Sequence, residues 1–159
     1  MTKPAPARDG QLPLDDYAKA IIEELQSDGR RSYAAIAKAV GLSEAAVRQR
    51  IARLVDGGVM QIVAVTDPLT VGFRRQAMIG IRADGDLRDV AERLSALVEV
   101  DYVVITAGSF DILVEVVAED DEHLLRLLNE SIRTVEGVRD TEAFIYLRLA
   151  KQTYTWGTR

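Results

Sequence analysis

The chain has 159 residues, 48% of them hydrophobic, and carries a formal net charge of −5. That content suffices for one ordinary domain or two small domains with packed cores, and it excludes disorder along the whole length. The lack of cysteine excludes a disulfide framework and thiolate metal ligands, and the single histidine argues against an imidazole metal site or a catalytic triad. We therefore expect no metal and no other cofactor.

The start of the chain shows no targeting signal. No apolar run approaches the ~20 residues needed to cross a bilayer, and the opening "MTKPAPARDGQ" lacks the apolar centre of a secretory signal. The sequence therefore predicts a cytoplasmic protein that begins with a mobile, proline-rich leader over residues 1–11.

The charge is divided unevenly along the chain. Residues 1–65 contain nine Lys/Arg and eight Asp/Glu, whereas residues 66–159 contain eleven and seventeen. The acidity therefore belongs to the second half. Residues 27–59 contain six basic residues and three acidic ones. This positive patch is modest, and it would matter most if an oligomer multiplied it.

Three helices are predicted in the first half. Asp15 can cap the first, Ser32 the second and Ser43 the third. Gly41 ends the second helix, where a left-handed residue would fit. The apolar residues recur at helical spacing in all three helices, and the buried stripes are Leu14, Ala18, Ile21 and Leu25, then Ile36, Ala37 and Val40, then Val47, Ile51 and Leu54.

The third predicted helix has a polar outer side and ends at the pair Gly57-Gly58. Counting about 100° per residue from Val47 gives the side that faces away from the core. Small residues beside Gln and Arg on that side would let the helix approach base edges closely. The side carries Ala45, Gln49, Ala52, Arg53 and Asp56, with Arg48 and Arg50 on its flanks.

Two helices joined by a short glycine-containing turn, the second amphipathic and basic, are typical of a helix-turn-helix. The following "VMQIVAVTD" is predicted to form a strand, or wing. Plain solvated three-helix domains share these features, so DNA binding and a structural role both stay open. The candidate base contacts are Arg48, Gln49 and Arg53, next to Ala45, and the candidate phosphate contacts are Ser43, Arg50 and Arg31. Arg50 lies near the core side, and its alternative role is to brace the helix through a salt bridge.

The second half alternates between strand and helix patterns. A strand begins at Phe73, and a helix in "DGDLRDVAERLSALVEV" has an apolar stripe that reaches Val98. Two β-branched runs on either side of "GSF" form a hairpin that turns at Gly108, a helix begins in "EDDEH", and a last strand covers about 141–149. The order β-α-β-β-α-β predicts a ferredoxin-like α+β domain.

The helices of such a domain cover only one face of its sheet. The other face carries Val, Ile and Tyr side chains, and it would be an exposed apolar patch in a monomer. We therefore predict that this domain forms a homodimer, which would also place two recognition helices on one DNA.

Catalytic chemistry is sparse. Ser109, His123 and Asp111 do not form a convincing triad, because no nucleophile elbow surrounds the serine. His123 is more simply a solvated helix residue, and Ser109 and Asp111 are either turn formers or ligand contacts. No Gly-rich phosphate loop is present. The sequence therefore does not predict an enzyme.

The motifs together resemble the Lrp/AsnC family, the feast/famine transcription regulators, from Leu14 to Trp156. The resemblance lies in "LDDYAKAIIEELQSDGRRSYAAIAKAVGLSEAAVRQRIARLVDGGVMQ", the linker "TDPLTVG", "TAGSFDILVEV" and "VEGVRDTEAFIYLRLAK". It implies dimers that often assemble into tetramers or octamers, and amino acids as effectors bound between subunits. The implied effector residues are Thr106, Gly108, Ser109, Phe110, Asp111 and Thr141. Ala143 departs from the family, since many members have a threonine there.

The domain prediction is a winged helix-turn-helix over 12–65, a linker over 66–72, an effector-binding and oligomerisation domain over 73–150, and a tail over 151–159. The predicted function is sequence-specific regulation of transcription through double-stranded DNA, modulated by a small effector. The alternative is a small-molecule sensor or an enzyme regulatory subunit whose helical domain docks a protein. Steep salt dependence would favour DNA.

Overall fold

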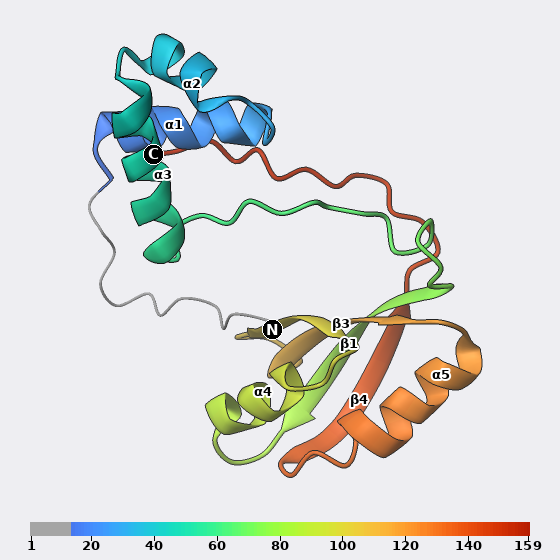
Figure 1. The fold of residues 1–159 in the computed structure, drawn as a ribbon. Coiled ribbons are helices and arrows are strands. Elements are labelled where there is room, and N and C mark those ends of the chain that lie inside the picture. Colours follow the sequence, from blue (N-terminus) through green and yellow to red (C-terminus); the bar gives the residue numbers. More distant parts are fainter. Residues whose placement is uncertain (1–13) are drawn as a thin grey trace. The chain divides into compact units, whose positions relative to one another are not determined.

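The computed structural model describes residues 14–159, so the predicted leader over 1–11 lies outside the described residues. The chain divides into two compact units (Figure 1). The first unit extends to Ala64 and also includes Lys151–Arg159, and the second is Val65–Ala150. Within residues 14–159, every helix is too short or too polar to cross a membrane.

The first unit consists of three helices whose caps agree with the sequence. Asp15, Ser32 and Ser43 each accept a hydrogen bond from the backbone N–H three residues further on, at 2.8, 3.2 and 3.2 Å. Gly41 ends the second helix with a left-handed φ of 74°, which glycine adopts without strain. The predicted caps are therefore confirmed. The helices are α1 (Asp16–Ser27), α2 (Tyr33–Val40) and α3 (Glu44–Asp56).

The core of this unit lies where the three helices meet. Ile21, Ile36 and Val47, one from each helix, have no exposed surface, and Ile51 continues the stripe on α3. Burying one such aliphatic side chain contributes about 1.5–3 kcal/mol. This packing fixes the rotation of α3 about its own axis, and therefore which of its side chains face outward.

The predicted wing strand is wrong. Residues 59–66 have no regular secondary structure, and Val63 and Val65 are 67% and 56% exposed. A strand needs a neighbour for its backbone hydrogen bonds, and no strand among residues 14–159 pairs with this segment. The β-branched run has strand propensity, but residues 14–159 offer it no partner strand.

The second unit has the predicted order β-α-β-β-α-β. Its four strands form one antiparallel sheet in the order β2-β3-β1-β4. A π-helical segment, η1, continues the last helix directly. The elements are β1 (Arg75–Ala83), α4 (Leu87–Ser95), β2 (Val100–Ile105), β3 (Ile112–Ala118), α5 (Asp121–Arg126), η1 (Leu127–Ile132) and β4 (Val138–Ile145).

The two faces of this sheet differ. Helices α4 and α5 lie on one face (Figure 1), and the core between them and the sheet includes the fully buried Ile79, Ile81 and Val114. On the other face, which we call the open face, the register aligns Met78 with Glu115 of β3 and with Phe144 of β4.

Two predicted boundaries in this unit are wrong. Helix α4 ends at Ser95, and Val98 is 89% exposed because the chain turns between Leu94 and Val100. Strand β4 ends at Ile145, and Leu147 is 95% exposed. Its partner β1 begins at Arg75, so the chain beyond β4 has no strand beside it to continue the ladder.

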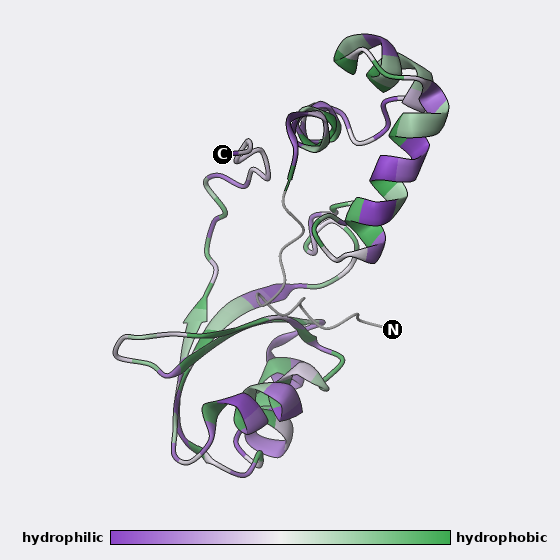
Figure 2. Ribbon diagram, turned by 90° about the vertical axis from the view of Figure 1, so that its left-hand side faces the viewer, coloured by the Kyte–Doolittle hydropathy of each residue, from purple (hydrophilic) through white to green (hydrophobic). Residues whose placement is uncertain are grey.

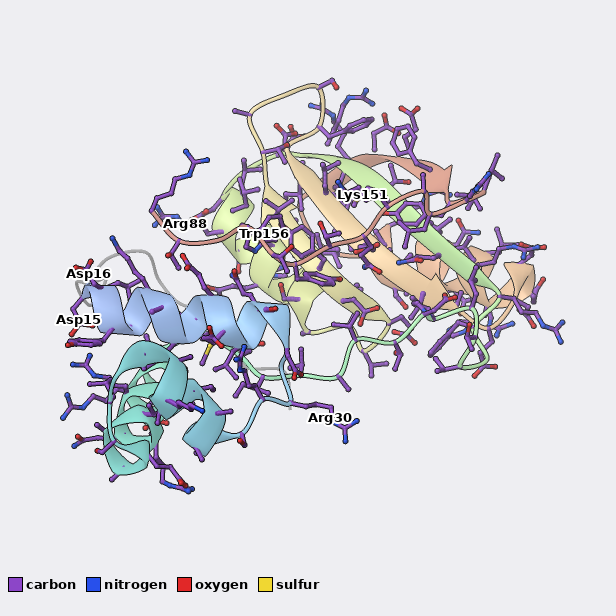
Figure 3. All side chains as sticks on the ribbon, turned by 90° about the horizontal axis from the view of Figure 1, so that it is seen from above. Asp15, Asp16, Arg30, Arg88, Lys151 and Trp156 are labelled. Carbon is purple, nitrogen blue, oxygen red and sulfur yellow. The ribbon has the colours of Figure 1, made fainter. Side chains whose placement is uncertain are left out.

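The tail over 151–159 contacts helix α1. The backbone N–H of Gly157 donates to Gln26 Oε1 at 3.1 Å, and Thr158 Oγ1 donates to Glu23 Oε1 at 2.5 Å. Trp156 is 79% exposed, and its side chain is labelled in Figure 3. The tail thus belongs to the first unit by contact, although it follows the second unit in sequence.

Candidate functional site

The outward side of α3 has the orientation that the helical spacing predicted. Hydrophilic and hydrophobic segments alternate along this helix (Figure 2), and Val47, Ile51 and Leu54 are its buried residues. The opposite side is exposed to solvent along the whole helix. We call this side the reading face; it consists of Ala45, Arg48, Gln49, Ala52, Arg53 and Asp56.

Two polar side chains of the reading face have no partner within the described chain. Gln49 and Arg53 form no side-chain hydrogen bond or ion pair with any of residues 14–159. They stand four positions apart, so they lie on the same side of the helix. Their donor and acceptor groups are available to a binding partner.

The other predicted DNA contacts are partly engaged inside the unit. Arg48 pairs with Glu44 at 3.0 Å, and its guanidinium lies 4.9 Å from the ring centroid of Tyr33. Arg31 forms an ion pair with Glu24. The Ser43 hydroxyl accepts the capping hydrogen bond, which leaves its own O–H free to donate.

Arg50 braces the helical unit. Its Nη1 donates to both carboxylate oxygens of Asp15, at 2.9 and 2.7 Å, and its guanidinium lies 5.4 Å from the Tyr17 ring centroid. The N–H of Ala18 and then the Arg50 guanidinium hold the pKa of Asp15 below its ordinary value. Arg50 therefore connects α3 to the cap of α1, which is the salt-bridge role that the sequence analysis gave as its alternative. A contact between Arg50 and a DNA phosphate would compete with this ion pair.

The predicted effector residues between β2 and β3 form one hydrogen-bonded turn, which we call the effector turn (residues 106–111). Thr106 Oγ1 donates to the carbonyl of Phe110 at 2.5 Å, and the N–H of Thr106 donates to the carbonyl of Asp111 at 2.8 Å. Asp111 Oδ2 accepts from the N–H of Ala83 at 2.9 Å. A Cβ on Gly108 would meet no atom within 4 Å, so the tip of the turn borders open space.

Two residues that the sequence analysis missed hold this turn against the sheet. The ring of Phe110 lies over Gly80, where a Cβ would come within 2.7 Å of the ring. Arg82 Nε donates to the carbonyl of Ser109 at 3.1 Å, and its guanidinium lies 4.7 Å from the Phe110 ring centroid. Arg82 also pairs with Asp140 at 2.6 Å. No local signal reveals this clamp, because Arg82 and Ser109 are far apart in sequence.

Thr141 is not brought to the turn within one chain. It pairs with Ile81 from one side of β1, whereas Asp111 donates to the carbonyl of Ile81 from the other side. Two strand spacings amount to about 10 Å. Thr141 Oγ1 accepts from Arg133 Nε at 2.9 Å. Its predicted effector contact therefore needs a ligand or a second subunit that spans β1.

His123 has a structural environment. Its Nδ1 accepts from the N–H of Glu119 at 3.3 Å, and its Nε2 lies 3.6 Å from a carboxylate oxygen of Glu99. Residues 14–159 contain no group of three or more His, Asp or Glu side chains arranged to hold a metal ion. The polar groups described so far are suited to binding rather than to bond-making chemistry.

Comparison with known proteins assigns both units. Residues 14–55 match the AsnC-type helix-turn-helix domain, and residues 73–159 match the C-terminal dimeric alpha+beta barrel domain of AsnC-type regulators. An HTH-type transcriptional regulator of Pyrococcus abyssi is 35% identical over 150 residues, which are 93% of this chain and 95% of the relative. The proline dehydrogenase transcriptional activator of Rhizobium radiobacter is 31% identical over 145 residues, 88% of this chain and 93% of the relative.

A solved structure agrees with these matches. The leucine response regulatory protein of Mycobacterium tuberculosis superimposes with a TM-score of 0.80 at 32% identity, over 87% of this chain and 96% of that one. A helix-turn-helix unit followed by a four-stranded α+β unit is thus shared along nearly the whole length. This chain belongs to the Lrp/AsnC family of transcription regulators, and it is a DNA-binding regulator rather than an enzyme.

Proposed function

We propose that this regulator recognises specific DNA sequences through the reading face of α3. The observation that carries the proposal is the pair Gln49 and Arg53, which are exposed and have no partner among the described residues. Arg can donate two hydrogen bonds to guanine and Gln can bond bidentately to adenine in the major groove. Ala45 and Ala52 beside them are small and exposed, so the helix can lie deep in the groove.

The surrounding groups suit phosphate contacts, which position a helix without reading sequence. Ser43 retains a free O–H, and the Arg48 guanidinium is exposed beside Glu44. Arg31 has the same function in the proposal if it releases Glu24 on binding. The relatives named above are transcription regulators, which favours DNA over the alternative, a helical unit that docks a protein.

A comparison of the affinities for two DNA sequences tests this proposal. A sequence selected from a random DNA pool and a scrambled control would be titrated against the full chain by fluorescence anisotropy. Arg53→Ala should weaken binding to the selected site more than to the scrambled one, since it removes a base contact. Arg88→Ala is the matched control, because Arg88 is an arginine of the second unit that forms no ion pair among residues 14–159 (Figure 3). Equal losses for both DNAs would contradict base reading by Arg53.

The proposal includes a homodimer formed through the open face. Tyr102 and Phe144 are 54% and 44% exposed there, which leaves apolar surface unburied in one chain. Gln76 Nε2 donates to Glu115 at 2.8 Å, so part of the polar surface on this face is already satisfied. Burial and the neighbouring Glu115 carboxylate raise the pKa of Tyr146 to about 12.

Light scattering tests the dimer. Phe144→Glu should shift the measured molecular mass toward that of one chain, and an unchanged mass would exclude this interface.

The proposal also assigns the effector turn to a small ligand, such as an amino acid. The tip at Gly108 and Ser109 is exposed and borders open space, and backbone N–H groups at such a tip can bind a carboxylate. The M. tuberculosis relative is named for its response to leucine, which supports an amino acid as the class. Thr141 would join the site only through a ligand that spans β1 or across a subunit boundary.

A thermal-shift screen of the twenty amino acids tests the effector. A ligand at a hundredfold excess over Kd stabilises the folded chain by about 2.7 kcal/mol, enough to raise the Tm visibly. Ser109→Arg should abolish the shift by filling the tip with a long side chain. A ligand whose shift survives this substitution binds elsewhere.

A further inference from the structure

The aromatic ring of Tyr33 contacts one arginine of the reading face. The guanidinium of Arg48 lies over this ring, 4.9 Å from its centroid, within the ~6 Å over which an aromatic face attracts a cation. Tyr33 is the first residue of α2 and Arg48 lies on α3. The contact therefore joins the two helices of the helix-turn-helix, and no spacing along one helix could have predicted it.

The position of the Tyr33 ring is fixed by the fold. Ser32 caps α2 by accepting from the N–H of Ala35 at 3.2 Å, which orders the backbone on both sides of Tyr33. The side chain of Tyr33 is half-buried and packs against the core cluster of the first unit, which contains Ile21 and Ile36. A planar guanidinium stacked on such a ring has few orientations left to it.

Glu44 restrains the same guanidinium from a second direction. Its Oε1 accepts from Nη2 of Arg48 at 3.0 Å, from a position four residues earlier on α3. The Nε and Nη1 groups of Arg48 have no partner among residues 14–159, and its side chain remains 64% exposed. The protein thus holds Arg48 on two sides, and the remaining N–H donors stay open to solvent on the reading face.

Arg50, on the same helix, shows how a bracing arginine differs. Its guanidinium also lies near a ring, that of Tyr17, but its Nη1 donates to both carboxylate oxygens of Asp15. Asp15 caps α1, so that ion pair ties two helices together, and the Arg50 side chain is only 31% exposed. The carboxylate that pairs with Arg48 lies on its own helix, so this pair orients the guanidinium without joining helices.

We propose that Tyr33 is a positioning residue for DNA binding, whose ring holds the Arg48 guanidinium in the orientation in which its free N–H groups contact a phosphate of the duplex. The inference rests on the proposed function and deepens it, because it names a residue that acts on DNA through another. A long side chain that is already ordered loses less conformational freedom on binding. A phosphate contact of fixed geometry also sets the register of the helix in the groove.

Two substitutions of Tyr33 test the proposal in the full chain, with the selected and the scrambled DNA described above. Tyr33→Leu should weaken binding to both DNAs roughly two- to tenfold, the range expected when one long side chain must be ordered on binding. Tyr33→Phe keeps the ring and should retain the affinity of the unaltered chain. Tyr17→Leu is the matched control: it removes the ring beside the bracing Arg50 and should leave DNA affinity unchanged.

Arg48→Ala separates positioning from a merely structural role. Alone, it should weaken binding to both DNAs and lower the slope of log affinity against log salt concentration by about one. In the Arg48→Ala background, Tyr33→Leu should cause no further loss of DNA affinity, whereas a loss that came from a weakened helical core would persist. Urea denaturation of each variant gives the folded fraction to which the affinity refers.

The proposal is overturned if Tyr33→Leu binds DNA normally, or if its loss of affinity survives in the Arg48→Ala background. It is also overturned if Tyr33→Phe loses as much affinity as Tyr33→Leu, because the hydroxyl would then make the contact. A loss confined to the selected DNA would mean that Arg48 reads a base and would overturn the phosphate assignment. These outcomes leave recognition by Gln49 and Arg53 intact, whereas an unaltered chain that binds neither DNA would refute the proposed function as well.

Discussion

The reading face of α3 and the effector turn both carry polar groups, but they differ in how many of those groups already have partners. On α3, Gln49 and Arg53 make no bond to any of residues 14–159. In the turn, the side chains of Thr106 and Asp111 are bonded to backbone groups, and Arg82 holds the carbonyl of Ser109. A surface whose polar side chains have no partners is suited to a large polar ligand such as DNA, whereas a turn whose side chains are bonded to its own backbone presents a fixed shape to a small ligand.

The largest expected effect is on DNA affinity and comes from the reading face of α3. Arg53→Ala should reduce the binding of the selected DNA by about 1–3 kcal/mol, which is roughly 5- to 150-fold. Its unfolding midpoint in urea should stay unchanged, because Arg53 supports nothing inside the unit. Anisotropy and denaturation on the same preparation check both halves. If Arg53→Ala also lowered the stability of the protein, the proposed difference between the reading face and the effector turn would be wrong.

Substitutions in the effector turn should lower stability and leave DNA affinity unchanged. Asp111→Ala leaves the half-buried N–H of Ala83 without its acceptor, which should cost about 1–3 kcal/mol of unfolding free energy. Asp111→Asn keeps an acceptor oxygen and should lose less. Urea denaturation measures both variants, and DNA affinity of the remaining folded protein should not change. Equal stability of the alanine variant and the unaltered chain would show that the bond to Ala83 is dispensable.

Gly80→Ala tests how the turn is held against the sheet. The new Cβ would stand 2.7 Å from the Phe110 ring, so the ring has to move off the strand. Overpacking of this kind costs about 1–3 kcal/mol, at the lower end here because an aromatic side chain can swing outward. Near-ultraviolet circular dichroism should report the displaced ring. Phe110→Ala in the same background should recover part of the lost stability.

The smallest effect belongs to the arginine of α3 that is already paired. Asp15 has a folded pKa below its unfolded value, so its contribution to stability is present above about pH 4 and is lost as the pH falls through the folded pKa. Arg50→Ala should lower the Tm slightly at neutral pH. That difference should shrink as the pH falls below about 4, and thermal melts across this range measure it. A difference that stays constant would mean that Arg50 acts through its contact with Tyr17 instead.

The sequence predicted the local features of this fold and missed the distant ones. Caps such as Ser43 and the stripe containing Val47 follow from spacings of three or four residues, which the helix geometry fixes. The clamp of Arg82 on Ser109 depends on strand register across the sheet, and no short pattern encodes it. The β-branched composition of residues 59–67 predicts a strand because strand propensity belongs to each residue separately, whereas a real strand requires a partner.

The candidate sites divide in the same way. The exposure of Gln49 follows from counting along one helix, but the pairing of Arg50 with Asp15 depends on how two helices meet. The resemblance predicts that Thr141 joins the effector turn, whereas the sheet places Thr141 on the far side of β1. A family resemblance predicts which residues contact a ligand, but it does not state which subunit supplies each of them.

The tail contacts α1, so the first unit contains both the N-terminal helices and the C-terminal end of the chain. The chain leaves this unit after Ala64 and is bound to it again at Gly157 and Thr158. The end of the chain is therefore joined to the first unit by two hydrogen bonds to side chains of α1. Proteolytic removal of the last few residues would therefore expose Gln26 and Glu23 of α1 without cutting into the three-helix core.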